Sequence, residues 1–122
     1  MPGDHLFAYG TLRRGSTNRF ARLLLERAQF VTSARAPGRL YDFGRFPGAV
    51  HSDQSDYWVH GEVHRLKDAQ LLPLLDEYEG SEFGREIVPV ETNDGGSIDC
   101  WIYWYVGPLT GRLIASGDWL KR

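Results

Sequence analysis

A short acidic stretch, DEYEG at residues 76–80, contains the side chain best suited to acid–base chemistry. The residues before it show helical spacing of apolar side chains. On such a helix Glu79 follows Leu75 by one turn and Leu72 by two, at the margin of the apolar stripe, whereas Glu77 points away from it. The sequence therefore predicts that Glu79 is the carboxylate most strongly withdrawn from water.

The position of Glu79 also predicts an unusual proton affinity. It lies in the last helical turn, just before Gly80 as the predicted C-terminal cap, where the helix dipole disfavours a negative charge. Desolvation acts in the same direction and raises the pKa of a carboxyl. A carboxylate at such a position is a candidate for general acid or base catalysis. An alternative stays open in which Glu79 reaches water or pairs with an arginine such as Arg85.

A second stretch, LFAYGTLRRG at residues 6–15, is predicted to be a short buried strand that runs into a glycine and a hydroxyl. Gly10 either supplies a positive φ for a tight turn or lets the backbone approach a small molecule. In the second case, the N–H groups after Gly10 face a carboxylate or an oxyanion, and Thr11 adds a hydroxyl. Tyr9 is interpreted equally well as a wall of the site or as a ligand contact.

Two segments with helical spacing flank the predicted strands. Residues 16–30 begin with a capping signal at Ser16 to Asn18 and continue as an amphipathic helix. Residues 67–80 form the helix that carries Glu79, and its apolar stripe is predicted to consist of Leu71, Leu74, Leu75 and Tyr78. Because proline is tolerated only in the first turn, Pro73 predicts that this helix starts late or bends.

The remaining segments have strand patterns. Residues 38–50 break at Gly or Pro every few positions, which indicates short strands joined by turns, and residues 57–66 alternate as a strand does. NDGG at 93–96 joins two strand-like arms, and the second arm, 97–106, is apolar on both faces. Such a strand belongs in a covered sheet or in the wall of a filled barrel. We predict one α+β domain over 1–122, a small closed or strongly bent mixed β-barrel with flanking helices.

Composition excludes several classes of function. The chain has 122 residues and a formal net charge of −2, and its basic residues are scattered, which argues against nucleic acid as a partner. No apolar run approaches the length of a membrane span. The start MPGDHLFAYG lacks the features of a signal peptide, and Cys100 is the single cysteine, so a cytoplasmic location is expected.

Neither metal chemistry nor thiol chemistry is indicated. His60 and His64 stand four apart on a predicted strand, a spacing that does not bring both side chains onto one ion, so no metal site is predicted. Cys100 alternates with aromatic residues in a strand, which is typical of a small core residue rather than a nucleophile.

The two candidate stretches, taken together with four others, give the chain a family resemblance. In this order and spacing they resemble the γ-glutamylcyclotransferase-like family, in particular its small bacterial single-domain members, across essentially the whole chain. The family is recognised by a YG(S/T)L loop near the N-terminus and by a helix end with one key glutamate. The segments that carry the resemblance are YGTL (9–12), LYDFGRFPGAV (40–50), HGEVHRL (60–66), LDEYEG (75–80), FGREIVPV (83–90) and IASGDWL (114–120).

The resemblance implies a β-barrel with a cavity between the YG(S/T)L loop and the glutamate. It also implies cyclisation of a γ-glutamyl group, in which the α-amine attacks the γ-carbonyl and releases 5-oxoproline and an amine or amino acid. Carried over by motif, Glu79 is the acid/base, and Tyr9, Gly10, Thr11 and Leu12 form the substrate loop. The implied partner is a small γ-glutamyl molecule, and neither a metal nor an organic cofactor is implied.

Departures from the family and competing hypotheses remain. Many relatives have a tyrosine where this chain has Phe83, so one hydroxyl is absent. Arg13 and Arg14 are either solvated or recognise the substrate α-carboxylate. The same pocket would also suit a non-catalytic module that binds a carboxylate or phosphate. An interaction protein would instead expose the aromatic face of Trp101 to Tyr105 and self-associate. A monomer or small homo-oligomer is expected, and the amine half of the substrate is left open.

Overall fold

The computed structural model describes residues 4–10, 19–52, 57–68 and 70–121. The N-terminal half contains β1 (His5–Ala8), α1 (Arg19–Arg27), β2 (Ala28–Asp42), β3 (Pro47–His51) and β4 (Trp58–Leu66). The C-terminal half contains α2 (Leu71–Glu79), β5 (Phe83–Thr92), β6 (Ser97–Tyr105), β7 (Arg112–Leu113) and a 3-10 turn, η1 (Trp119–Lys121). None of the described helices is long and apolar enough to cross a bilayer.

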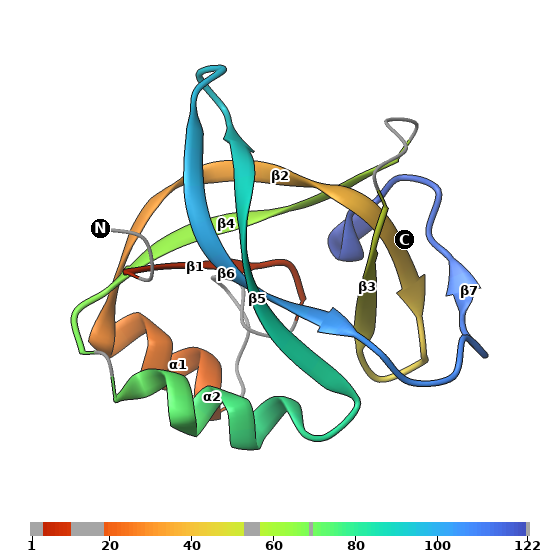
Figure 1. Cartoon of the computed structure of the whole chain (residues 1–122), viewed down its shortest axis with the longest axis horizontal. Coiled ribbons are helices and arrows are strands. Elements are labelled where there is room, and N and C mark those ends of the chain that lie inside the picture. Colours follow the sequence, from red (N-terminus) through yellow and green to blue (C-terminus); the bar gives the residue numbers. More distant parts are fainter. Residues whose placement is uncertain (1–3, 11–18, 53–56, 69, 122) are drawn as a thin grey trace.

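Five strands close into a barrel (Figure 1). Their order is β1-β4-β2-β3-β6, and β6 pairs back with β1 to complete the ring. The sheet is mixed, because β6 runs parallel to both β1 and β3 whereas β4 runs antiparallel to β1 and β2. Two further strands extend it, since β5 pairs with β6 and β2 while β7 pairs with β2. The predicted closed mixed barrel with flanking helices is therefore confirmed.

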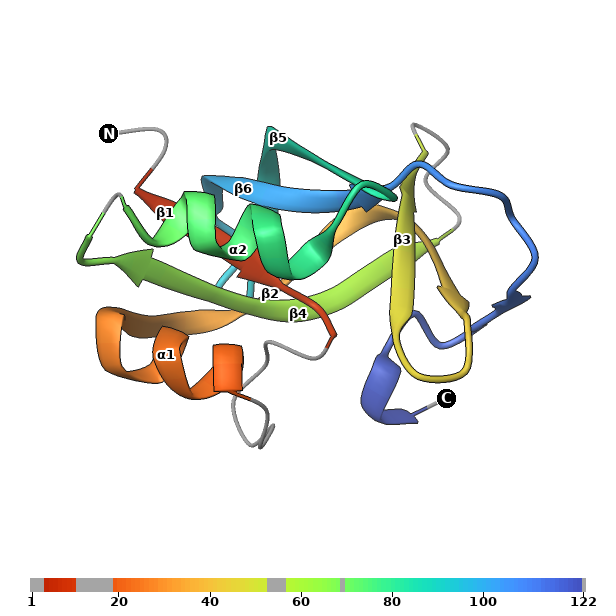
Figure 2. The ribbon, with the colours of Figure 1, turned by 90° about the horizontal axis from the view of Figure 1, so that it is seen from below.

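Two apolar clusters hold the helices and the barrel together. Alternation along β1 sends Phe7 into the barrel interior and Leu6 and Ala8 toward the helices. Both helices lie side by side on one side of the barrel (Figures 1 and 2). Burial of each large apolar side chain contributes about 1.5–3 kcal/mol, so the helices are held firmly on the sheet. The buried residues of this outer cluster are Leu6, Ala8, Leu24, Ala28, Leu71, Leu75 and Tyr103.

The first predicted helix is shorter than its sequence pattern. The α1 helix ends at Arg27, and Ala28–Phe30, predicted as helical, open the 15-residue strand β2. Pairing explains the change, because this segment forms a ladder with the end of β4 and tertiary contacts override local helical preference. The capping signal at Ser16–Asn18 lies outside the described residues. The region 38–50, predicted as short strands joined by turns, contains the end of the long strand β2, a turn and most of β3.

The second helix starts late, as Pro73 predicts. It begins at Leu71, so Pro73 is its third residue and lies in the first turn, where a missing N–H does no harm. The predicted stripe is wrong at Leu74, which is 38% exposed, because the buried face uses Leu72 instead. Gly80 ends the helix at φ 84°, a conformation that favours glycine.

The predicted hairpin at residues 85–106 forms as β5 and β6. Four consecutive residues of β6, Ile102–Tyr105, are buried, so both faces of this strand are covered. This burial contradicts the hypothesis of an exposed aromatic face that binds a partner. Cys100 is fully buried in the same strand, and burial raises its thiol pKa to about 12, which confirms that it is a core residue.

Candidate functional site

A cavity of about 350 Å³ opens beside the C-terminal end of α2. Its wall is formed by the end of β1, the turn between β2 and β3, the end of α2, the start of β5, and β6. The structure thus brings the predicted residues Tyr9, Gly10 and Glu79 to one cavity, whereas Thr11, Leu12, Arg13 and Arg14 lie outside the described residues. The lining residues are Phe7, Ala8, Tyr9, Gly10, Arg45, Phe46, Pro47, Tyr78, Glu79, Glu82, Phe83 and Tyr103.

The Glu79 carboxyl is the acidic group that the sequence analysis singles out. It stands at the last position of α2, partly buried, while Glu77 on the opposite side of the helix is exposed. Burial raises the pKa of Glu79 to about 7. Within the described part of the chain its carboxyl makes no hydrogen bond or ion pair. The alternative in which Glu79 pairs with Arg85 is not what the structure shows, because Arg85 binds Asp76.

The Tyr9 hydroxyl is engaged within the protein. It donates a hydrogen bond to the carbonyl of Tyr103 at 2.5 Å and accepts one from the N–H of Ala49 at 3.1 Å. These bonds tie the end of β1 to β6 and β3. Burial, followed by the neighbouring Glu79, raises the pKa of Tyr9 above its usual value, so the phenol stays protonated. Its aromatic ring belongs to the cavity wall, and a substrate contact by Tyr9 stays a prediction.

Gly10 is required for close packing rather than for a left-handed backbone. It is not among the described glycines with positive φ, so the tight-turn interpretation is wrong. A Cβ at this position would lie 2.5 Å from Cγ of Pro47, a distance that real Cβ contacts do not show. Gly10 therefore lies directly against the first residue of β3, and both residues line the cavity.

The lining residues that the sequence analysis did not single out include Arg45, Phe46 and Glu82. Arg45 and Phe46 come from the GRFPG turn between β2 and β3, and Glu82 follows α2. Arg45 is exposed and is the only basic residue among the described lining residues. The available signal was an arginine beside a glycine in a turn, but spacing alone did not reveal that this turn and the end of α2 line one cavity.

The aromatic part of the wall includes Phe83. Its ring packs edge-on against Phe46 and Tyr105, at centroid distances of 6.0 and 5.5 Å. Tyr105 donates a hydrogen bond to a carboxylate oxygen of Glu82 at 3.2 Å. At this departure from the family, the chain thus places a ring without a hydroxyl on the cavity.

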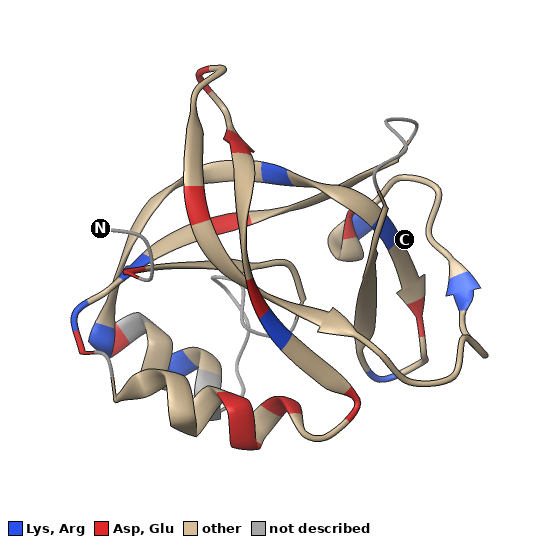
Figure 3. Cartoon of the chain, viewed as in Figure 1, with Lys and Arg blue, Asp and Glu red and all other residues tan. Residues whose placement is uncertain are grey.

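Asp76, one turn before Glu79, has an opposite environment. Its two oxygens accept hydrogen bonds from Nε and Nη2 of Arg85 at 2.8 and 3.1 Å, and Oδ1 also accepts one from the Tyr103 hydroxyl at 2.7 Å. Burial raises the pKa of Asp76, but these hydrogen bonds and the charge of Arg85 together lower it below its usual value. Acidic segments gather at this end of α2, beside a basic segment of β5 (Figure 3).

The described part of the chain offers no cluster of metal ligands. Among the described residues, no group of three or more His, Cys, Asp or Glu side chains is placed to hold a metal ion. Of the two histidines considered in the sequence, His64 is buried on β4, and its Nε2 lies 3.2 Å from Oε1 of Glu62.

Comparison with known proteins gives a consistent result. The model of the family described as Gamma-glutamyl cyclotransferase, AIG2-like, matches residues 6–121. The Gamma-glutamylcyclotransferase family protein YtfP of Escherichia coli strain K12 is 34% identical over an alignment of 126 positions, which covers 96% of each chain. Gamma-glutamylaminecyclotransferase of Rattus norvegicus is 27% identical over 116 residues, 81% of this chain and 76% of that protein.

Solved structures share the fold. The crystal structure of YkqA from Bacillus subtilis superposes with a TM-score of 0.76 at 31% identity. The match covers 95% of this chain but 39% of YkqA, so YkqA is the longer protein.

Proposed function

Because the chain belongs to the gamma-glutamyl cyclotransferase, AIG2-like family and is therefore a cyclotransferase-like enzyme, we propose that it cyclises a γ-glutamyl amide with Glu79 as the acid/base. The products are 5-oxoproline and a free amine or amino acid. The observation that carries the proposal is the carboxyl of Glu79, which lines the cavity without a described hydrogen-bond partner and has a pKa of about 7.

The reaction needs one proton to move twice. An α-amine has a reference pKa of about 8, so most of it is protonated at neutral pH and cannot attack. The neutral fraction attacks: its nitrogen bonds to the γ-carbonyl carbon, the five-membered ring closes, and ionised Glu79 accepts the proton that this nitrogen loses. Protonated Glu79 then donates the proton to the leaving nitrogen as its bond to that carbon breaks. A pKa near neutrality suits both transfers, because either protonation state is easily reached.

The loop after β1 would bind the γ-glutamyl half. Gly10 lines the cavity, and we propose that it acts with Tyr9, Thr11 and Leu12 as the substrate loop. Backbone N–H groups of such a loop stabilise the oxyanion that forms when the carbonyl is attacked. Arg45 lies on the same cavity, and its guanidinium has the charge and geometry to bind the substrate α-carboxylate.

The test measures 5-oxoproline release from γ-glutamyl amino acids and γ-glutamyl amines, the second class being included because of the name of the rat relative. Wild type is compared with Glu79→Gln, which keeps the shape and removes the base, and with Glu77→Gln as a matched control. Glu77 is exposed on the same helix, so its variant should keep wild-type activity. Loss of a general acid/base lowers kcat by about 10²–10⁴-fold.

Two outcomes would contradict the proposal. Equal rates for wild type and Glu79→Gln would eliminate the acid/base role of Glu79. Saturable binding of glutamate-like ligands without turnover of any panel member would favour a non-catalytic binding module in the same cavity.

A further inference from the structure

Two carboxylates stand one turn apart near the end of α2, and one of them binds an arginine. Asp76 and Glu79 are three residues apart, a spacing that places side chains next to each other on a helix surface. The sequence would allow Arg85 to pair with either. In the structure the guanidinium binds Asp76 through two parallel hydrogen bonds of 2.8 and 3.1 Å. This two-bond geometry is the strongest form of an arginine–carboxylate contact and fixes the plane of the guanidinium.

Two further contacts hold Arg85 in this position. Its guanidinium carbon lies 4.2 Å from the centre of the Trp101 ring, an arrangement that adds a cation–π attraction. The Tyr103 hydroxyl donates to Asp76 Oδ1 at 2.7 Å, so Asp76 has partners on both neighbouring strands, β5 and β6. Because Arg85, Trp101 and Tyr103 all belong to the β5–β6 hairpin, the rigid sheet determines where the cation lies.

The same network fixes the helix end that carries Glu79. The N–H of Gly80 donates to the carbonyl of Asp76 at 3.0 Å, which closes the last turn of α2. Tyr103 lines the same cavity as Glu79 and also contacts Asp76. Tyr103 therefore connects this cavity to the Asp76–Arg85 pair, in which the arginine balances the charge of Asp76.

We propose that Asp76 is a positioning residue for this site: it retains Arg85 one helical turn from Glu79 and so keeps the Glu79 carboxyl free to act as a base. A cation moved onto Glu79 would favour its ionised form and make it a weaker base. Without Arg85, the negative charge of Asp76 would instead repel an ionised Glu79. The balanced pair avoids both effects. The inference rests on the proposed function in taking Glu79 as the base.

Other ionisable side chains, from several elements, line the cavity with Glu79. Tyr9 from the end of β1, Arg45 from the β2–β3 turn and Glu82 after α2 line the cavity with it. Tyr103 faces it from β6. The phenols of Tyr9 and Tyr103 are protonated at neutral pH, because burial raises both pKa values. None of these four groups is substituted in the variants of Asp76 and Arg85, and Tyr103 is the one that contacts Asp76 directly.

The experiment follows the titration of the Glu79 side-chain carboxyl by ¹³C NMR, with the signal assigned from its loss in Glu79→Gln. Asp76→Asn should lower the midpoint by about 1 pH unit, because Arg85 is released toward Glu79. Arg85→Gln should raise it by a similar amount. The double variant, which has neither charge, should return close to the wild-type midpoint. Arg85→Lys, which keeps the charge, should also stay close to wild type.

The opposite signs separate this role from simple support of the fold. Loss of a structural contact would move both single variants in the same direction, and that result would overturn the proposal, as would two unchanged midpoints. If Asp76→Asn does not fold, the upward shift in Arg85→Gln tests the idea alone, and an unchanged or lower midpoint contradicts it. Since the NMR titration needs no turnover, its result is independent of whether Glu79→Gln abolishes 5-oxoproline release.

Discussion

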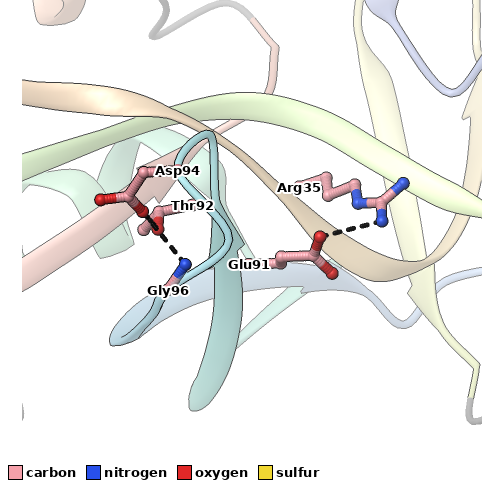
Figure 4. A network of polar contacts seen from close by, with 5 residues as sticks. All are labelled: Arg35, Glu91, Thr92, Asp94 and Gly96. Atoms are coloured by element: carbon pink, nitrogen blue, oxygen red, sulfur yellow. Dashed lines mark hydrogen bonds and ion pairs between the residues drawn. The ribbon is translucent and has the colours of Figure 1, made fainter.

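Glu79 and the carboxylates near the far end of β5 have opposite environments. Near its far end, Glu91 binds Arg35 at 2.9 Å, and Asp94 in the hairpin turn accepts hydrogen bonds from Thr92 and from the N–H of Gly96 (Figure 4). These hydrogen bonds lower the pKa of Asp94. At the other end, beside the cavity, Glu79 has no such partner among the described residues, and burial raises its pKa to about 7.

This difference distinguishes structural carboxylates from one available for chemistry. A carboxylate that accepts hydrogen bonds from an arginine, a hydroxyl or a backbone N–H is stabilised in its ionised form and is a poor base. Asp76 shows that the contrast does not depend on the helix itself, because it has two partners only one turn from Glu79. What differs is whether the neighbouring strand supplies donors.

The largest effect that sharpens this contrast is on stability. The pKa of Glu79 rises from 4.5 to about 7 in the native state, so the folded chain holds a proton that the unfolded chain releases. The stabilisation this provides is present below pH 4.5 and is lost as pH rises toward 7. Glu79→Gln should therefore be more stable than wild type by up to about 3 kcal/mol at pH 8, with a smaller difference at pH 5.

Urea unfolding at both pH values measures this difference, and Glu77→Gln serves as the exposed control. A variant that is no more stable than wild type at pH 8 would show that Glu79 is not held in an unfavourable environment.

A second effect concerns the hydroxyl of Tyr9. Tyr9→Phe leaves the carbonyl of Tyr103 and the N–H of Ala49 without their partner. A buried N–H left without its acceptor costs about 1–3 kcal/mol, so thermal unfolding should occur at a clearly lower temperature. If stability is unchanged while KM rises, the hydroxyl acts on substrate rather than on the joining of β1, β3 and β6.

A third effect tests Arg45 as the group that binds substrate charge. Arg45→Met keeps much of the length of the side chain and removes its cation. Because Arg45 is exposed, the lost attraction is modest, and KM should rise about 10-fold, equivalent to about 1.4 kcal/mol, with kcat little changed. An unchanged KM for γ-glutamyl substrates would remove Arg45 from the binding site.

The smallest effect is expected at the far end of the hairpin. The side chains of Arg35 and Glu91 are 40% and 41% exposed, and exposed ion pairs contribute about 0–1 kcal/mol. Glu91→Gln should change the free energy of unfolding by less than about 1 kcal/mol and leave the pH dependence of catalysis as in wild type. A shifted pH profile would mean that distant charges, rather than local burial, set the proton affinity of Glu79.

The sequence predicted those features that local patterns determine. The position of Glu79 at the edge of an apolar stripe, the late start at Pro73 and the NDGG hairpin at 93–96 follow from periodicity and turn chemistry. These patterns also placed the candidate base on a helix end, and the strand patterns and the family resemblance both predicted the barrel around it.

Other features depend on contacts between distant segments. Ala28–Phe30 continue a helical pattern but pair with β4, and Gly10 is needed because Pro47, far along the chain, lies against it. The choice of Arg85 between two neighbouring carboxylates is likewise decided by the hairpin that carries it. Such contacts leave no signal in a single sequence, since each depends on how the barrel closes.

The pH dependence of kcat/KM for the wild-type enzyme tests the central claim most directly. If Glu79 is the base, kcat/KM should rise through a pKa of about 7 and rise further as the substrate amine loses its proton at about pH 8. A profile that stays flat from about pH 5 to pH 8, a range that brackets the expected transition, would contradict the assignment of Glu79 as the titrating base.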